Sequence, residues 1–215
     1  MRAARFASLL VVSLAVLPAC SDDVSTPVTV SWLEWADSVA GGVPFSVRVR
    51  GMGATTADLR ITVHVRGDTV TIEPYSVASS SCGGTCTPPP LLEYDMLLGV
   101  PAIQTATPRT VTIRATSGWP ALQQPWPLRT FGTVTVSPTV PVQPLTRSVG
   151  VASGFQDSFG CFLVLPGSFG PYISADQHPA WAPGFNGFVY GRVDPELAST
   201  CLDDAPVIQV DSIVQ

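Results

Sequence analysis

The alternation of apolar and polar residues between Pro27 and Pro138 limits the fold more than any other feature of this sequence. Successive side chains of a β-strand point to opposite faces of the sheet, so a period of two indicates a strand with one buried face. Two stretches show the period most clearly: Phe45-Val47-Val49 alternates with Ser46-Arg48-Arg50, and Leu59-Ile61-Val63-Val65 alternates with Arg60-Thr62-His64-Arg66. With 21 Pro and 18 Gly in 215 residues, the composition also favours strands and turns, so we expect an all-β protein.

Seven strands are expected in residues 27–137. Segments 28–35, 92–99, 109–115 and 130–136 add to the strands around Val47, Val63 and Val70, and Gly67-Asp68 predicts a two-residue hairpin turn. The strand count, the alternation and the segment from Asp37 to Gly51 resemble a bacterial immunoglobulin-like domain, which implies a seven-stranded sandwich. The cysteine pair that joins the two sheets of antibody domains is absent from this stretch.

A second unit is expected after a proline-rich linker at residues 138–145. Residues 146–215 contain five expected strands, at 147–153, 160–165, 171–175, 186–193 and 206–214, and no convincing amphipathic helix. Five short strands of this kind resemble a small OB-like barrel, which implies a closed or nearly closed sheet. We therefore predict a sandwich at 27–137 followed by a barrel at 146–215.

The first 20 residues predict export. Arg2 and Arg5 precede an apolar run from Phe6 to Leu17, and small residues follow, as in a secretory signal. The run is too short for a permanent membrane span, which takes about 20 apolar residues. Leu17-Pro18-Ala19-Cys20 resembles the lipobox of bacterial lipoproteins, with Pro18 as its one unusual residue.

The lipobox resemblance implies a processing route and a location. Residues 1–19 would be a cleaved signal peptide, Cys20 would carry fatty acids such as palmitate, and residues 20–26 would form the tether. Several acyl chains on one residue hold a protein firmly to a membrane. Ser21, rather than Asp, follows the cysteine and favours the outer membrane over the inner membrane as the place within the cell envelope.

The other four cysteines predict two disulfides, because an exported chain meets an oxidising compartment. Cys82 and Cys86 enclose a flexible Gly-Gly-Thr segment and are expected to pair, which leaves Cys161 with Cys201. A four-thiolate zinc site is disfavoured because Cys161 and Cys201 lack the close spacing of zinc ligands. A redox pair is disfavoured because prolines, and not a helix start, follow Cys86.

The sequence predicts no catalytic residues, metal site or cofactor. The two histidines, His64 and His178, fall on the polar face of a strand and in a loop, and no motif of serine hydrolases, zinc proteases or nucleotide-binding proteins occurs. Acidic residues gather around Cys201, namely Asp194, Glu196, Asp203 and Asp204, where a Ca²⁺ site and a solvated loop are the alternatives and the loop is preferred. The part after residue 137 holds two Arg and seven acids, which argues against a nucleic-acid partner.

Four aromatic residues in loops are the candidate binding residues. Trp119 and Trp126 lie in the segment 117–128, and Trp181 and Phe185 lie in a C-terminal loop. Exposed rings of this kind could bind a glycan or a protein, whereas buried rings would pack between the two domains. The preferred hypothesis is a non-catalytic envelope lipoprotein that acts as a binding or spacer module. A structural lipoprotein without a dedicated ligand is the first alternative, and an enzyme or metal-dependent factor is the disfavoured second one.

Overall fold

The computed structural model of the chain describes residues 24–53, 59–78, 92–117, 127–140, 144, 146–167, 169–175, 182, 184–194, 196–197, 201 and 205–215. Every regular element in these ranges is a β-strand, and the strands form two sheets. The predicted all-β class is therefore confirmed. No described segment is a helix with the length and apolar character to cross a membrane.

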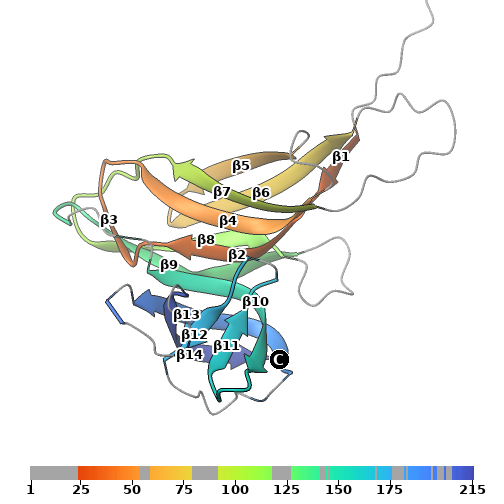
Figure 1. The fold of residues 1–215 in the computed structure, drawn as a ribbon. Coiled ribbons are helices and arrows are strands. Elements are labelled where there is room, and N and C mark those ends of the chain that lie inside the picture. Colours follow the sequence, from red (N-terminus) through yellow and green to blue (C-terminus); the bar gives the residue numbers. More distant parts are fainter. Residues whose placement is uncertain are drawn as a thin grey trace, which may run out of the picture.

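The first sheet has six strands and forms one layer of the sandwich (Figure 1). Its order is β1 (Val24–Pro27), β6 (Thr69–Ala78), β8 (Arg109–Thr116), β9 (Leu128–Ser137) and β3 (Ser38–Ala40), with β5 (Leu59–Arg66) paired to β6. The β5–β6 hairpin turns at Gly67 and Asp68, as predicted, and Gly67 has the positive φ of 55° that such a turn requires.

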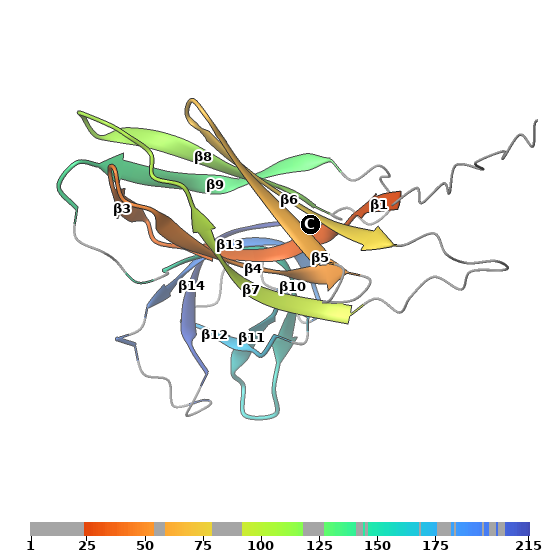
Figure 2. The same ribbon diagram turned by 90° about the horizontal axis from the view of Figure 1, so that it is seen from above.

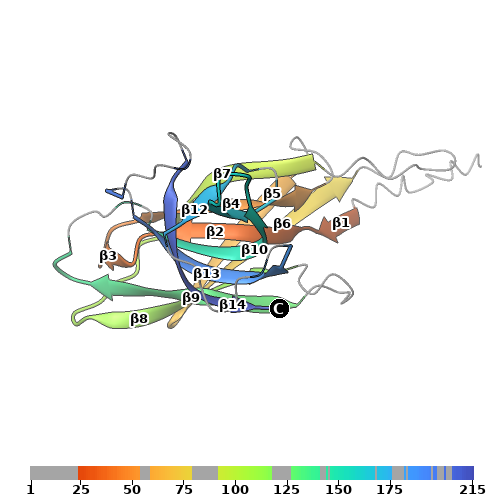
Figure 3. The same cartoon turned by 60° about the horizontal axis from the view of Figure 1, so that its bottom comes forward.

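The second sheet has eight strands and belongs to both halves of the molecule (Figure 3). Strands β7 (Leu92–Val100), β4 (Phe45–Gly53) and β2 (Thr29–Trp35) form the second layer of the sandwich. The sheet then continues through β10 (Arg147–Gln156), β13 (Asn186–Asp194), β14 (Val207–Val214), β12 (Tyr172–Ser174) and β11 (Phe162–Leu165). Because β11 also pairs with β10, these last five strands close into a barrel.

All seven strands expected for the sandwich and all five expected for the barrel are present. The structure adds the short strands β1 and β3. The chain leaves one sheet at the end of β2 and enters the other as β3, which pairs in parallel with β9. Strands β6 and β8 also pair in parallel, which is possible because β7, between them in sequence, lies in the opposite layer.

The sandwich core consists of apolar side chains from both layers. Its largest buried members include Trp35, Leu33, Phe131, Ile72 and Ile113. Glycine at position 132 leaves room for Trp35, since a Cβ there would lie 2.9 Å from the indole ring. The Trp35 Nε1 donates a hydrogen bond to the carbonyl of Thr133, 3.1 Å away, so the buried indole is satisfied across the two layers.

The barrel has its own core and a covalent staple. Val164, Tyr172, Val189 and Ile208 are among the buried residues inside it. A disulfide joins Cys161 to Cys201, the pairing expected from the sequence, and closes a loop of 40 residues. Cys82 and Cys86 lie outside the described residues, as does Cys20.

Candidate functional site

The junction between sandwich and barrel begins with backbone pairing of β2 to β10. Arg147 to Gly150 lie opposite Trp35 to Trp32, so the barrel continues the sandwich sheet without a break. Gly150 permits this close approach, because a Cβ there would lie 2.0 Å from the carbonyl oxygen of Ser31. The sequence suggested two units joined by a linker and gave no sign of this pairing.

Both faces of β2 are buried because one faces the sandwich and the other faces the barrel. Leu33 and Trp35 belong to the sandwich core, whereas Trp32 belongs to the barrel core and stacks on Tyr172 at 5.5 Å between ring centroids. Side chains of the barrel also enter the sandwich core, where Phe188 meets Phe131 edge to face at 5.1 Å. The junction is therefore a packed interior and not a hinge.

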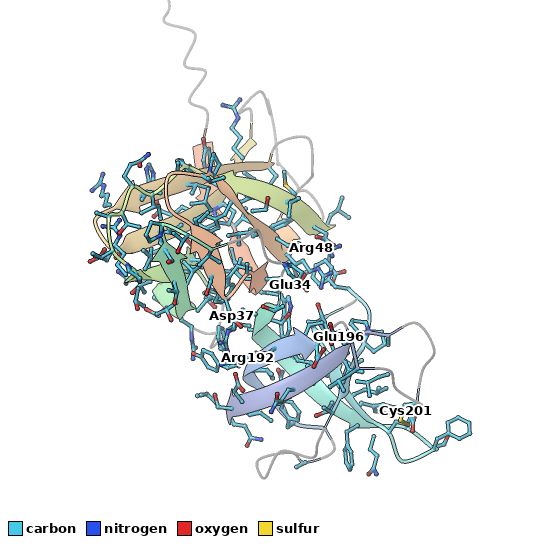
Figure 4. All side chains as sticks on the ribbon, turned by 90° about the vertical axis from the view of Figure 1, so that its left-hand side faces the viewer. Glu34, Asp37, Arg48, Arg192, Glu196 and Cys201 are labelled. Carbon is cyan, nitrogen blue, oxygen red and sulfur yellow. A yellow bond between two sulfur atoms is a disulfide. The ribbon has the colours of Figure 1, made fainter. Side chains whose placement is uncertain are left out.

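A polar cluster of Glu34, Arg48, Arg50, Asp95 and Tyr172 lies within this junction, and Figure 4 shows Glu34 and Arg48 between the two halves. Arg50 Nη1 lies 3.1 Å from Glu34 Oε1 and donates to the Tyr172 hydroxyl at 2.9 Å. The Tyr172 hydroxyl in turn donates to Glu34. All three side chains are buried, so the ion pair and the hydroxyl satisfy one another away from water.

The outer half of this polar cluster is more exposed. Arg48 binds Asp95 through two parallel hydrogen bonds of 2.8 and 2.7 Å, and Arg50 Nε donates to the same carboxylate at 3.2 Å. The guanidinium of Arg50 also lies 5.4 Å from the centroid of the Phe169 ring. Strands β2, β4 and β7 thus supply charges that the barrel covers through Tyr172 and Phe169.

Ionisation in the polar cluster follows from these contacts. Burial alone raises the pKa of Asp95, but the hydrogen bond from Arg48 and the positive charges of Arg48 and Arg50 outweigh it and hold that pKa below its ordinary value. The hydrogen bond to Asp95 raises the pKa of Arg48. Burial, assisted by the Glu34 carboxylate, raises the pKa of Tyr172, so its hydroxyl keeps its proton at neutral pH.

A second group of charges lies on another side of the junction. Arg147 bridges Asp37 and Asp211 at 2.9 and 2.8 Å, joining the corner after β2 to β14. Beside it is an open cleft of about 490 Å³, lined by Asp37, Pro144, Thr146, Arg192, Val193, Asp194 and Gln209. We name it the junction cleft. Its hydroxyl, amide, carboxylate and guanidinium groups are suited to hydrogen bonding with a polar ligand.

Of the four candidate binding residues, the structure describes only Phe185. Trp119, Trp126 and Trp181 lie outside the described residues. Phe185 is 5% exposed and packs in the barrel core, where a Cβ on Gly154 would lie 2.0 Å from its ring. The prediction that Phe185 belongs to an exposed binding surface is therefore incorrect, because its ring fills the space that Gly154 leaves open. Burial inside the barrel, rather than between the two units, accounts for it.

The acidic residues near Cys201 are described only in part. Asp194 accepts a hydrogen bond of 2.9 Å from the Glu196 backbone, whereas Asp203 and Asp204 lie outside the described residues. Within the described ranges, no three His, Cys, Asp or Glu side chains come together as ligands for a metal ion. His64 is exposed on β5, 3.8 Å from Glu73, and His178 is not described.

One feature of the sequence reflects the covering of both faces of β2 at the junction. Residues 32–35, Trp-Leu-Glu-Trp, break the apolar–polar alternation of a half-buried strand. A strand whose two faces are both covered loses that alternation. Comparison of the chain with protein-family models, with curated proteins and with solved structures finds no match.

Proposed function

We propose that this chain is a non-catalytic, lipid-anchored envelope lipoprotein that presents its barrel as a rigid module. The observation that carries the presenting role is the continuous sheet from β7 to the barrel, since it fixes the barrel relative to the sandwich. Interdomain contacts that allow motion are small and polar, whereas here backbone pairing, shared cores and a buried ion pair act together.

The anchoring part rests on the lipobox and gains support from the position of β1. Three residues separate Cys20 from Val24, where the sandwich begins. Four residue steps span at most about 14 Å. A lipid on Cys20 would therefore hold β1 close to the bilayer surface, and in Figure 1 the barrel lies below the sandwich while β1 lies at its upper right end.

The binding role belongs to the junction cleft in this proposal. A glycan would meet several hydrogen-bonding side chains there, from both the sandwich and the barrel. A protein segment of polar character would meet the same groups. The alternative, a structural lipoprotein without a dedicated ligand, is favoured by the burial of Phe185, which removes one aromatic candidate.

Anchoring is tested by cell fractionation of two neighbouring variants. The wild-type chain and Ser21→Ala are expected in the membrane fraction and to incorporate labelled palmitate. Cys20→Ser is expected to lose the label and to leave the lipid-bound pool. Label on Cys20→Ser equal to that on the wild type would contradict the proposal.

Ligand binding is tested by a glycan-array and envelope-protein screen with the soluble chain starting at Ser21. Binding in the cleft predicts that Gln209→Ala and Asp194→Ala weaken any hit, while Glu73→Ala, on β6 of the sandwich, does not. A hit that none of these variants changes would place the ligand elsewhere. A screen without saturable binding would favour the structural alternative.

A further inference from the structure

Strand β7 leaves one edge of the eight-stranded sheet unpaired among the strands that the structure describes. It ends the sheet order and pairs only with β4, through all nine of its residues and without a bulge. Figure 2 shows β7 along a border of the sandwich, and Figure 3 shows it along the rim of the molecule. It contains no proline, a residue that commonly protects edges from pairing with another chain, and its charged residues are Glu93 and Asp95.

Apolar side chains are exposed along this edge. Leu92, Met96 and Leu97 on β7 are 46%, 39% and 64% exposed, and Met52 on the neighbouring β4 is 42% exposed. These side chains project from both faces of the sheet along one edge, so a strand added to that edge would contact apolar groups on either side. Leu97 and Met52 lie on the outer face, which also carries the acidic Glu93 and Asp95. Leu92 and Met96 lie on the opposite face, which carries the core residue Tyr94. The two carboxylates restrict which partner strand fits.

We propose that β7 pairs with β7 of a second copy, antiparallel and about a twofold axis at Met96. This register uses the whole strand, because residues 92 and 100 are equally distant from 96. It places Tyr94 opposite the partner's Leu98, and Asp95 opposite the partner's Leu97. Glu93 lies opposite the partner's Gly99, where nothing is within 4 Å of an added Cβ, and its carboxylate lies beside Gly167 of its own chain.

The other registers place like charges opposite each other, pair a shorter part of the strand, or set side chains of opposite faces side by side. A slip of one residue places inward side chains of one strand beside outward side chains of the other, which the common sheet does not allow. An axis at Asp95 sets two carboxylates directly opposite each other, and an axis at Tyr94 sets Glu93 against the partner's Asp95. Like charges in such positions destabilise the pairing. An axis at Leu97 avoids them but leaves Leu92 and Glu93 beyond the strand end.

The twofold arrangement is self-complementary, as closed dimers require. The row across the outer face would read Arg50, Asp95, the partner's Leu97 and the partner's Arg48, so each carboxylate keeps its arginine neighbours. A dimer of this kind would present two barrels on one continuous sheet. This inference concerns assembly and does not depend on the lipid or on the junction cleft.

Cysteine cross-linking in the full chain tests the axis directly. In Met96→Cys the two introduced cysteines would face each other, and directly opposed strand residues lie about 4.5–5.5 Å apart, within the Cα range of disulfides. Met52→Cys is the control, because Met52 is exposed to a similar extent but lies on β4. We expect a dimer band on non-reducing gels for Met96→Cys alone. Equal cross-linking of both variants, or none at position 96, would overturn the proposal.

A charge exchange at Leu97 tests the register without relying on added thiols. Leu97→Asp would face the partner's Asp95 twice by symmetry, whereas Leu97→Lys would pair with it. We expect Leu97→Asp to weaken dimerisation of the full chain in detergent roughly tenfold by sedimentation, and Leu97→Lys to preserve or strengthen it. A monomeric wild type, or the same effect from both substitutions, would show that β7 does not pair in this way.

Discussion

Removing Arg50 tests whether the polar cluster holds the barrel to the sandwich. In Arg50→Met the Glu34 carboxylate loses its ion pair at 3.1 Å and Tyr172 loses a donor at 2.9 Å. Glu34 is 7% exposed, so water cannot replace the lost partner, and Arg48 lies 3.9 Å away. Breaking a buried pair by removing one member costs about 3–5 kcal/mol. Because Arg48 is close enough to compensate in part, we expect a loss near the lower end, about 3 kcal/mol.

Urea unfolding of the soluble chain from Ser21, followed by tryptophan fluorescence, measures this loss. Arg48→Met is the matched control: it lies two residues away on the same strand and binds the same Asp95, but its side chain is 42% exposed. An exposed pair contributes about 0–1 kcal/mol. The two variants are thus expected to differ by about 2 kcal/mol or more.

A double variant separates the loss of a partner from the loss of packing. Glu34→Gln combined with Arg50→Met removes both charges, so it should cost less than the sum of the single losses. Equal effects of Arg50→Met and Arg48→Met would show that Arg50 does not form a stabilising buried pair with Glu34. So would full additivity of the Glu34 and Arg50 substitutions, because neither result is expected of a buried, coupled pair.

Three further predictions concern the sheet, the staple and pH. Gly150→Ala would place its Cβ 2.0 Å from a backbone oxygen of β2 and should destabilise the fold by about 3 kcal/mol or more. Gly99→Ala places its Cβ in open space and should change stability by less than about 0.5 kcal/mol. Urea unfolding measures both changes. Cys161→Ser combined with Cys201→Ser removes the disulfide that closes a 40-residue loop, so the free energy of unfolding under non-reducing conditions should fall by about 3 to 4 kcal/mol. A wild-type chain that resists urea equally well before and after reduction would contradict this. The pKa of Asp95 is lowered from 3.8 in the folded chain, so the stabilising effect of its carboxylate is complete above pH 3.8 and is lost as pH falls through the lower, folded pKa. Asp95→Asn should therefore lose less stability than the wild type as the solution is acidified. Parallel losses of stability in acid would contradict this.

The strands were predictable from the sequence because a half-buried strand requires apolar and polar residues to alternate along the chain. Val47 and Val49 are fully buried, as their alternation with Ser46 and Arg48 indicated. Arg50 follows the same alternation and was expected on the solvent side, yet it is 6% exposed. The period gives the side of the sheet to which a residue belongs, but another part of the chain decides whether that side is covered.

The junction could not be derived in the same way, because it depends on pairing between strands far apart in sequence. Strand β10 pairs with β2 more than 100 residues earlier, and no local pattern specifies such a partner. The Trp-Leu-Glu-Trp run at 32–35 shows that both faces of β2 are covered, but not what covers them. Phe185 illustrates the same point, since an aromatic residue in a loop can fill the space above a glycine such as Gly154.

The intact mass of the mature chain extracted from membranes shows whether Cys20 carries a lipid. We expect a polypeptide that begins at Cys20 and carries the added mass of a diacylglyceryl group, with or without a further acyl chain on the amine. The soluble Cys20→Ser chain should lack that mass. A mature wild-type chain that begins at another residue, or that begins at Cys20 without lipid, would show that the chain is not anchored through Cys20.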